Sequence, residues 1–159
     1  MAKASFSSDD KLAFCRERGA DAGINYATED LKEGLRRLTG GKGADIIFDP
    51  VGGTYAEAAL RAIAWEGRFL VIGFPAGIPK IPLNLTLLKN CDIVGVFWGA
   101  AVARDPAGHR QNVKELFDLY RAGKIRPHVS EHFPLEKAAD AIVHLASRKA
   151  MGKVVVTMD

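Results

Sequence analysis

The fold is decided by the stretch Gly43-Ala44-Asp45-Ile46-Ile47-Phe48-Asp49-Pro50-Val51-Gly52-Gly53, in which an apolar run ends abruptly at Asp-Pro. A helix-like segment, Tyr55 to Ala64, follows the glycine pair. A short run of β-branched and aromatic residues, bounded by turn residues and followed by a helix, is typical of a buried strand in a parallel α/β sheet. Ligands of such sheets bind outside the carboxyl ends of the strands. We therefore expect residues 49–53 to lie at a ligand-binding edge.

The same alternation of strands and helices continues on both sides of this stretch and predicts a doubly wound parallel sheet of the Rossmann type. The expected strands are residues 3–6, 22–26, 44–49, 68–73, 92–99, 129–133 and 153–158. The expected helices are residues 11–18, 28–38, 55–64, 84–90, 106–122 and 134–148, with a turn at 65–67. No linker or repeat interrupts the pattern, so we expect one domain over residues 1–159.

Composition and charge exclude several classes of protein. The chain is 48% hydrophobic and 26% charged, which is sufficient for a packed core. Its net charge of +3 comes from scattered basic residues, so we expect no nucleic-acid partner. No apolar run approaches the roughly 20 residues that span a bilayer, and the N-terminus does not resemble a signal peptide. We expect a cytoplasmic protein without a membrane partner.

Three groups of residues could bind a ligand, and each also has a simpler structural interpretation. Glycines in residues 49–53 would let the backbone approach a flat ligand, or would only form a tight turn. Ser7 and Ser8 at a helix N-terminus, with Lys11, suit a phosphate, or only cap the helix beside a solvated lysine. Tyr26 at a strand end could stack on a base, or could be a half-buried aromatic residue.

Motifs that would identify a catalytic or metal centre are absent from the sequence. Neither the two cysteines nor the four histidines have metal-ligand spacing, so we predict no metal site. A complete dinucleotide-binding fold carries G-x-G-x-x-G after its first strand. No such motif occurs, and Gly40-Gly41-Lys42-Gly43 precedes a strand, which predicts a turn. We predict no catalytic residue from motifs.

Seven short motifs nevertheless occur in an order that resembles one family. They are Ser7–Leu12, Gly19–Asp21, Ile24–Tyr26, Leu38–Asp45, Asp49–Gly53, Gly67–Gly73 and Gly152–Val156. In this order they resemble the C-terminal, cofactor-domain portion of the NADPH:quinone oxidoreductases. These form the zinc-free branch of the medium-chain dehydrogenase/reductase superfamily, so a relationship to zinc-binding dehydrogenases is expected. The resemblance covers essentially the whole chain.

The resemblance implies a site for NADPH and hydride transfer from it to a quinone or an activated alkene. The protein would position and shield the reactants rather than supply acid–base catalysis. The residues implied for the 2′-phosphate are Ser7, Ser8, Lys11 and Arg148, and Tyr26 would lie near the adenosine. The residues implied around the nicotinamide are Asp49, Val51, Gly52, Gly73, Phe74, Phe97 and Trp98.

The same resemblance implies that part of the sheet is missing from this sequence. The family's first strand and its glycine-rich loop have no counterpart here. In the strand order 3-2-1-4-5-6 that strand is central, so we expect a gap between the pair 3–6 and 22–26 and the strands that begin at Ala44. A separate N-terminal half could fill the gap, and family dimers pair through the strand equivalent to Asp92–Phe97. A non-catalytic dimerising α/β module is the alternative function, and a methyltransferase-like domain is a weaker one.

Overall fold

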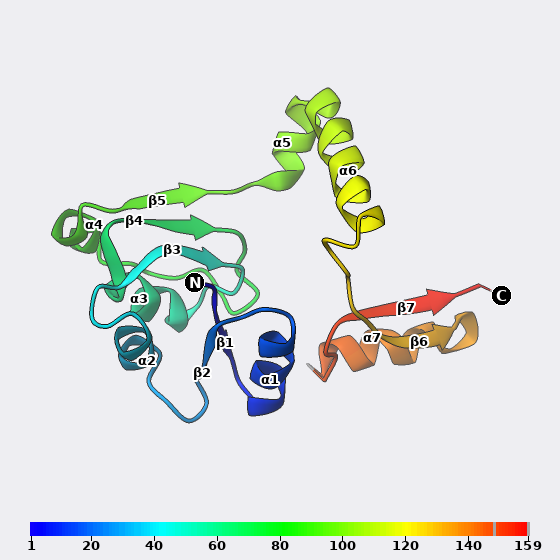
Figure 1. The fold of residues 1–159 in the computed structure, drawn as a ribbon, viewed down its shortest axis with the longest axis horizontal. Helices are drawn as coiled ribbons and strands as arrows, with labels where there is room; N and C mark the ends of the chain where they lie inside the picture. Colours follow the sequence, from blue (N-terminus) through cyan, green and yellow to red (C-terminus); the bar gives the residue numbers. More distant parts are fainter. Residues whose placement is uncertain (148, 159) are drawn as a thin grey trace. The chain divides into compact units, whose positions relative to one another are not determined.

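The computed structural model describes residues 1–147 and 149–158, which divide into two compact units, Met1–Trp98 and Gly99–Asp159. Figure 1 shows their helices and strands in chain order. Both units combine helices with parallel strand pairs, which confirms the predicted α/β class. The sequence predicts one domain over residues 1–159, and that remains a prediction after the division into two compact units.

The first unit holds two parallel sheets separated by the expected gap. One sheet is β1 (Lys3–Phe6) with β2 (Ala22–Asn25), and the other is β3 (Ala44–Asp49), β4 (Ile63–Val71) and β5 (Asp92–Gly95) in that order. Within the described part of the chain, no strand pairs with the outer edge of β1 or of β3. The two sheets therefore correspond to the two halves of the order 3-2-1-4-5-6 without its first strand.

Two glycines allow helices to pack closely on opposite faces of the β1–β2 sheet. The helices of the unit are α1 (Asp9–Glu17), α2 (Leu31–Leu38), α3 (Thr54–Arg61) and α4 (Asn84–Lys89). A Cβ on Gly23 of β2 would lie 2.6 Å from Leu12 of α1, and a Cβ on Gly34 of α2 would lie 2.9 Å from Ile24 of β2. Because successive strand residues point to opposite faces, α1 and α2 lie on different sides of this sheet.

One hydrophobic core joins the two sheets into a single unit. Ile24 of β2, Leu60 of α3 and Phe69 of β4 are each at most 1% exposed and belong to the same cluster, as does Leu85 of α4. Both sheets thus present one face to this cluster, which we call the core face. Burial of each large side chain contributes about 1.5–3 kcal/mol to folding.

The opposite face of the β3–β4–β5 sheet is exposed, and we call it the open face. Residues paired in parallel register point to the same side. The register therefore places on the open face Ile46, Phe48, Arg68, Leu70, Asp92 and Val94. Ile46 and Phe48 are each 65% exposed, whereas Ile47 between them packs against the core. The apolar character of β3 on both faces is unusual for a sheet with one solvated side.

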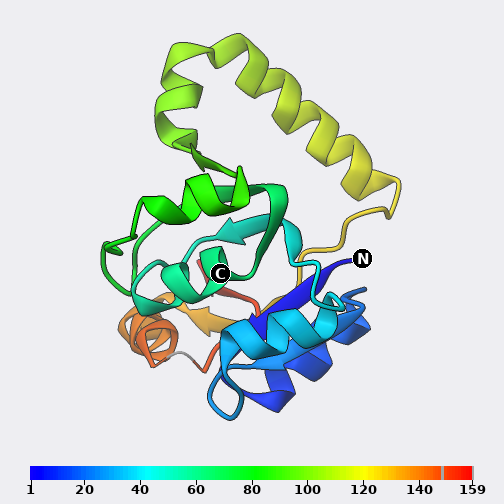
Figure 2. The same cartoon turned by 90° about the vertical axis from the view of Figure 1, so that its left-hand side faces the viewer.

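The second unit contains a parallel strand pair and several helices. Its elements are α5 (Trp98–Arg104, which begins at the last residue of the first unit), α6 (Pro106–Arg121), β6 (Val129–Pro134), the 3-10 helix η1 (Leu135–Lys137), α7 (Ala138–Ala146) and β7 (Lys153–Thr157). Figure 2 shows α5 and α6 as consecutive helices, and Asp105 caps α6 by accepting from the Gly108 amide. The sequence does not predict that β7 pairs with β6. None of the described helices is long and apolar enough to cross a membrane.

Two sequence predictions about element boundaries are wrong. The helix that follows β3 ends at Arg61, and the predicted turn at residues 65–67 lies inside β4. A register shift against β3 and a φ of 59° at Glu66 accommodate these residues in the strand. The strand predicted for residues 92–99 ends at Gly95, because β4 ends at Val71, whose carbonyl already accepts from the Val96 amide.

The first prediction concerns the core. Leu60→Ala leaves a cavity at a fully buried position and should lower the free energy of unfolding of the first unit by about 2–5 kcal/mol. Leu87→Ala, at an 81% exposed position on α4, should change it by less than about 0.5 kcal/mol. Urea denaturation followed by circular dichroism measures both values, and equal effects would contradict the assigned core.

Candidate functional site

The carboxyl ends of β3 and β4 meet in a hydrogen-bonded pair of turns. The Val51 and Gly52 amides donate to Asp49 Oδ1 at 2.9 and 3.0 Å. The Gly53 amide donates to the Gly77 carbonyl at 2.7 Å, and the Ala76 amide donates to the Val51 carbonyl at 3.0 Å. The Asp49 carboxylate therefore organises the turn after β3, and the loop after β4 is bonded to that turn.

Packing within these turns requires glycine at position 52. Its φ is +70°, and a Cβ there would lie 2.8 Å from the Gly77 carbonyl oxygen and 3.1 Å from the Phe74 ring. The observed contacts thus agree with the simpler interpretation, a tight turn. Gly73 has more room, since its nearest neighbour would be the Pro50 oxygen at 3.6 Å, and Phe74 is 44% exposed. A role of these residues toward a ligand stays a prediction.

The end of β5 contributes two exposed aromatic residues to the same edge. Phe97 is 79% exposed and Trp98 is 67% exposed. The Val96 amide donates to the Val71 carbonyl, which holds the start of this segment beside the end of β4. Phe97 and Trp98 were predicted to lie in a strand, but Phe97 follows the strand and Trp98 is the first residue of α5. Their predicted role beside the nicotinamide stays a prediction.

The end of β1 leads directly into the N-terminus of α1. Ser8 is the N-cap, and its Oγ accepts from the Lys11 amide at 3.4 Å. Asn25 Nδ2 donates to Asp9 Oδ1 at 3.0 Å, which ties the first turn of α1 to the end of β2. Ser7 precedes the cap, and Lys11 lies in the first turn. The capping interpretation is therefore correct for Ser8, and the helix N-terminus also presents its positive dipole end at this edge.

A contact between two tyrosines brings the strand ends of both sheets together. Tyr26 follows β2, and its ring centroid lies 4.7 Å from that of Tyr55 in the first turn of α3. Tyr26 is partly buried and packs against the core cluster. Sequence reasoning missed Tyr55, although its position two residues after the Gly52-Gly53 pair could have indicated it. Arg148, predicted for the phosphate, lies outside the described residues.

An ion pair fixes the segment that follows Tyr26. Arg37 Nη2 lies 2.8 Å from Glu29 Oε2. The hydrogen bond and charge of the Arg37 guanidinium hold the pKa of Glu29 below its usual value, and the carboxylate raises the pKa of Arg37 in return. Because both groups are at the surface, the pair orients the segment more than it stabilises the fold.

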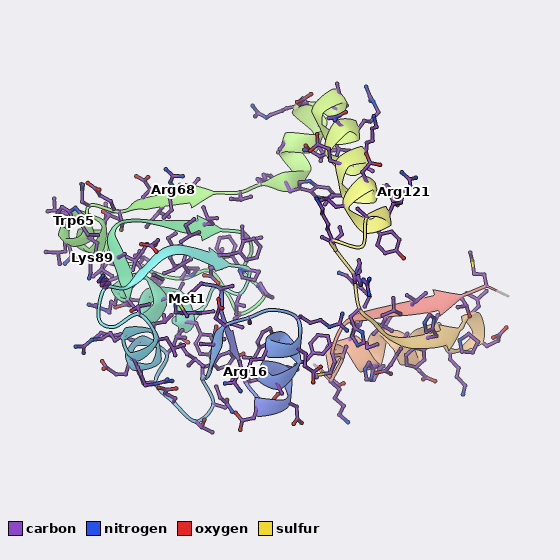
Figure 3. The ribbon with its side chains drawn as sticks, in the orientation of Figure 1. Met1, Arg16, Trp65, Arg68, Lys89 and Arg121 are labelled. Carbon is purple, nitrogen blue, oxygen red and sulfur yellow. The ribbon has the colours of Figure 1, made fainter. Side chains whose placement is uncertain are left out.

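A hollow in the first unit lies at the opposite, amino edge of the sheet. This cavity of about 240 Å³ is lined by Lys32, Arg36, Gly41, Gly43, Arg61, Ala62, Ile63 and Lys89. Arg36, Arg61 and Lys89 occupy the last turns of α2, α3 and α4, whose dipoles end negatively there. Lys89 is labelled in Figure 3. Arg36 also pairs with Glu33, and Arg61 pairs with Glu57. The charges of these cations are balanced by the negative ends of the helix dipoles and by the carboxylates. We therefore do not assign an anion site to this hollow.

The described residues do not fit a metal centre. No group of three or more His, Cys, Asp or Glu side chains in residues 1–147 and 149–158 is arranged to hold a metal ion.

Parallel strands with polar and aromatic residues grouped at their carboxyl ends define an α/β fold of the dinucleotide-binding type. A family model described as zinc-binding dehydrogenase matches residues 18–156. The chain therefore belongs to the zinc-binding dehydrogenase family. The relatives below confirm the resemblance to quinone oxidoreductases that the ordered motifs predicted.

Three similar proteins illustrate the relationship. The chain is 40% identical over 152 residues to a quinone oxidoreductase-like protein 2 homolog of Nematostella vectensis, covering 94% of this chain and 42% of that protein. A quinone oxidoreductase structure from Pseudomonas syringae pv. Tomato DC3000 superposes with a TM-score of 0.87 at 25% identity, covering 98% and 48%. A mycobacterial protein complexed with NADPH superposes with a TM-score of 0.83 at 25% identity, covering 98% and 49%. The chain thus spans less than half of the length of these relatives.

The second prediction concerns the turn after β3. Asp49→Ala removes the acceptor of the Val51 and Gly52 amides and should lower the free energy of unfolding by about 1–2 kcal/mol. Asp49→Asn retains an oxygen at the same place and should lose less than about 0.5 kcal/mol. Chemical denaturation of the two variants measures the difference. An equal loss in both would show that the charge, rather than the acceptor geometry, holds the turn.

Proposed function

We propose that the first unit forms part of the nicotinamide-cofactor site of an oxidoreductase of the NADPH:quinone reductase type. One observation carries this proposal: the α1 N-terminus, Tyr26 and the turns after β3 and β4 gather at one edge of a family member's parallel sheets. The relative complexed with NADPH supports the choice of cofactor class. The reaction would be hydride transfer to a quinone or an activated alkene in a cytoplasmic enzyme, with NADPH supplying the hydride.

The residues of this chain would bind and orient the cofactor rather than exchange protons with a substrate. Ser7, Ser8 and Lys11 would hold the 2′-phosphate end, and Tyr26 would lie beside the adenosine. Asp49, through the turn that it organises, would position the backbone of Val51 and Gly52 near the nicotinamide. Gly73, Phe74, Phe97 and Trp98 would border the same ring and limit its exposure to water.

The end of β1 favours NADPH over NADH. Enzymes that use NAD place an acidic residue on the ribose hydroxyls, whereas a phosphate needs cations and hydroxyl donors. Ser7 and Ser8 follow β1, and Lys11 lies in the first turn of α1. The neighbouring Asp9 carboxylate already accepts from Asn25, so it is engaged toward β2.

A non-catalytic dimerising module is the second candidate, and the edge position of β5 favours dimerisation in either case. β5 ends the order β3-β4-β5, and all four of its residues are exposed. An exposed edge strand is a template for pairing with a second copy. Cofactor binding distinguishes the two candidates, because only the enzyme part needs it.

The third prediction tests cofactor binding. Lys11→Glu replaces a phosphate-binding cation by a repelling acid and should weaken NADPH binding about tenfold or more, while NADH binding changes little. Lys42→Glu makes the same charge change in the turn before β3 and should leave both affinities unaltered. Titrations with NADPH and NADH, followed by nicotinamide fluorescence, measure the affinities. Absence of NADPH binding to the unchanged chain would contradict the proposal for this chain alone.

The fourth prediction tests dimerisation. Light scattering at micromolar concentration should give the mass of a dimer for the unchanged chain. Phe97→Asp places a charge beside the β5 edge and should shift the mass to that of a monomer, whereas Leu87→Asp, on exposed α4, should not. A monomeric unchanged chain would argue against pairing through β5.

A further inference from the structure

We propose that Asn25 is a positioning residue that determines the choice between NADPH and NADH. Its side chain ties the Asp9 carboxylate to the end of β2, so that this carboxylate does not turn toward the 2′-phosphate. A released Asp9 would repel that phosphate and would accept from a ribose hydroxyl instead. The proposal rests on the nicotinamide-cofactor site proposed above and adds to it a residue that controls its specificity.

The backbone of Asn25 is fixed beside the end of β1. Asn25 is the last residue of β2 and the register partner of Phe6, the last residue of β1. The next amide, that of Tyr26, donates to the Phe6 carbonyl at 3.0 Å. The Asn25 carbonyl accepts from the amides of Thr28 and Glu29 at 3.1 and 2.9 Å, which closes a turn. The Asn25 side chain therefore starts from a defined place next to the residues that follow β1.

The two ends of the Asn25 side-chain amide have different partners, and only one orientation of the amide suits both. Its Oδ1 accepts from the Ala27 amide at 3.1 Å, and its Nδ2 donates to Asp9 Oδ1 at 3.0 Å. A backbone amide can only donate, and an ionised carboxylate can only accept. The nitrogen of Asn25 must therefore face Asp9. An aspartate at position 25 would keep the bond to Ala27 but would set a second carboxylate against Asp9.

The direction of the Asp9 carboxylate matters because of its place in the chain. Asp9 is the first residue of α1 and directly follows Ser7 and Ser8, the hydroxyls proposed for the 2′-phosphate. Enzymes that use NAD place a carboxylate on the ribose 2′-hydroxyl, and a carboxylate in that place would repel a phosphate. The chain thus carries an acid of the kind that favours NADH beside a site proposed for NADPH, and the bond to Asn25 engages that acid.

This role has a signature that a structural role lacks. Specificity is the difference between two binding free energies, so Asn25 can set it without touching either cofactor. Release of Asp9 should weaken the binding of NADPH and spare that of NADH. A disturbed backbone after β2 should weaken both alike. The ratio of the two affinities therefore separates the proposed role from a structural one.

The fifth prediction concerns the ratio of the dissociation constants for NADH and NADPH. Asn25→Asp should lower this ratio about fivefold or more, and Asn25→Ala should lower it in the same direction. Asn90→Asp is the matched control, because Asn90 Nδ2 donates to Glu66 Oε1 at 3.3 Å, just before β5. It sets two carboxylates together in the same way and should leave the ratio unaltered. Titrations of this chain, followed by nicotinamide fluorescence, measure both constants.

Two double variants of equal net charge separate the specific bond from the overall charge. Asn25→Asp with Asp9→Asn exchanges donor and acceptor and should restore the ratio to within about twofold of the unchanged chain. Asn25→Asp with Asp10→Asn removes a charge from the same helical turn without restoring the pair, so the ratio should stay low. Equal ratios in these two double variants would overturn the proposal.

The same titrations distinguish a failure of this proposal from a failure of the proposed function. If the unchanged chain binds NADPH and the Asn25 variants leave the ratio unaltered, or weaken both cofactors by the same factor, the role of Asn25 alone is overturned. If the unchanged chain binds neither cofactor, the proposed function is overturned, and the role of Asn25 with it.

Discussion

The first unit depends on the packing of Ile24 against the cluster around Leu60 and Phe69. Its two sheets share no ladder of hydrogen bonds, so side-chain burial must hold them in place. Gly34 makes this possible, because any larger residue would collide with Ile24 and push α2 away. Hydrophobic burial is not directional, but interiors pack densely enough to define one arrangement. The strand ends are consequently aligned by the core rather than by a continuous sheet.

The geometry of the candidate site depends on this alignment of the strand ends by the core. Local hydrogen bonds fix the backbone after two of the strands. Ser8 caps the helix after β1, and the Asp49 carboxylate organises the turn after β3. The Tyr26–Tyr55 contact then couples the two sheets at their carboxyl ends. The result is an edge with helix N-termini on one side and exposed aromatic rings on the other. That combination suits a ligand with both anionic and flat aromatic parts.

The sequence predicts the alternation of strands and helices and the parallel α/β class, because the periods of strands and helices are local properties. The resemblance to the family also predicts the gap between β1 and β3, because the glycine-rich motif of the family's first strand is absent from the sequence. The sequence predicts the boundaries of strands less well where pairing with another strand determines them. The Trp65–Gly67 segment contains turn residues and forms an irregularity inside β4, because Ile63 and Arg68 on either side of it pair with β3. The residues after Gly95 are apolar, yet they leave the strand because β4 offers no further partner. For the candidate site, the residues of the ordered motifs lie at the carboxyl edge and their role toward a ligand stays a prediction, whereas Tyr55 depends on a contact between segments distant in sequence.

The unpaired edges of β1 and β3 also affect how the chain behaves when it is alone. Natural proteins protect the edges of sheets, because a free row of backbone donors and acceptors recruits any other extended chain. Here the edges of β1 and β3 lie in one unit, and Ile46 and Phe48 are exposed on β3. At high concentration the isolated chain would therefore tend to form ordered aggregates through strand stacking.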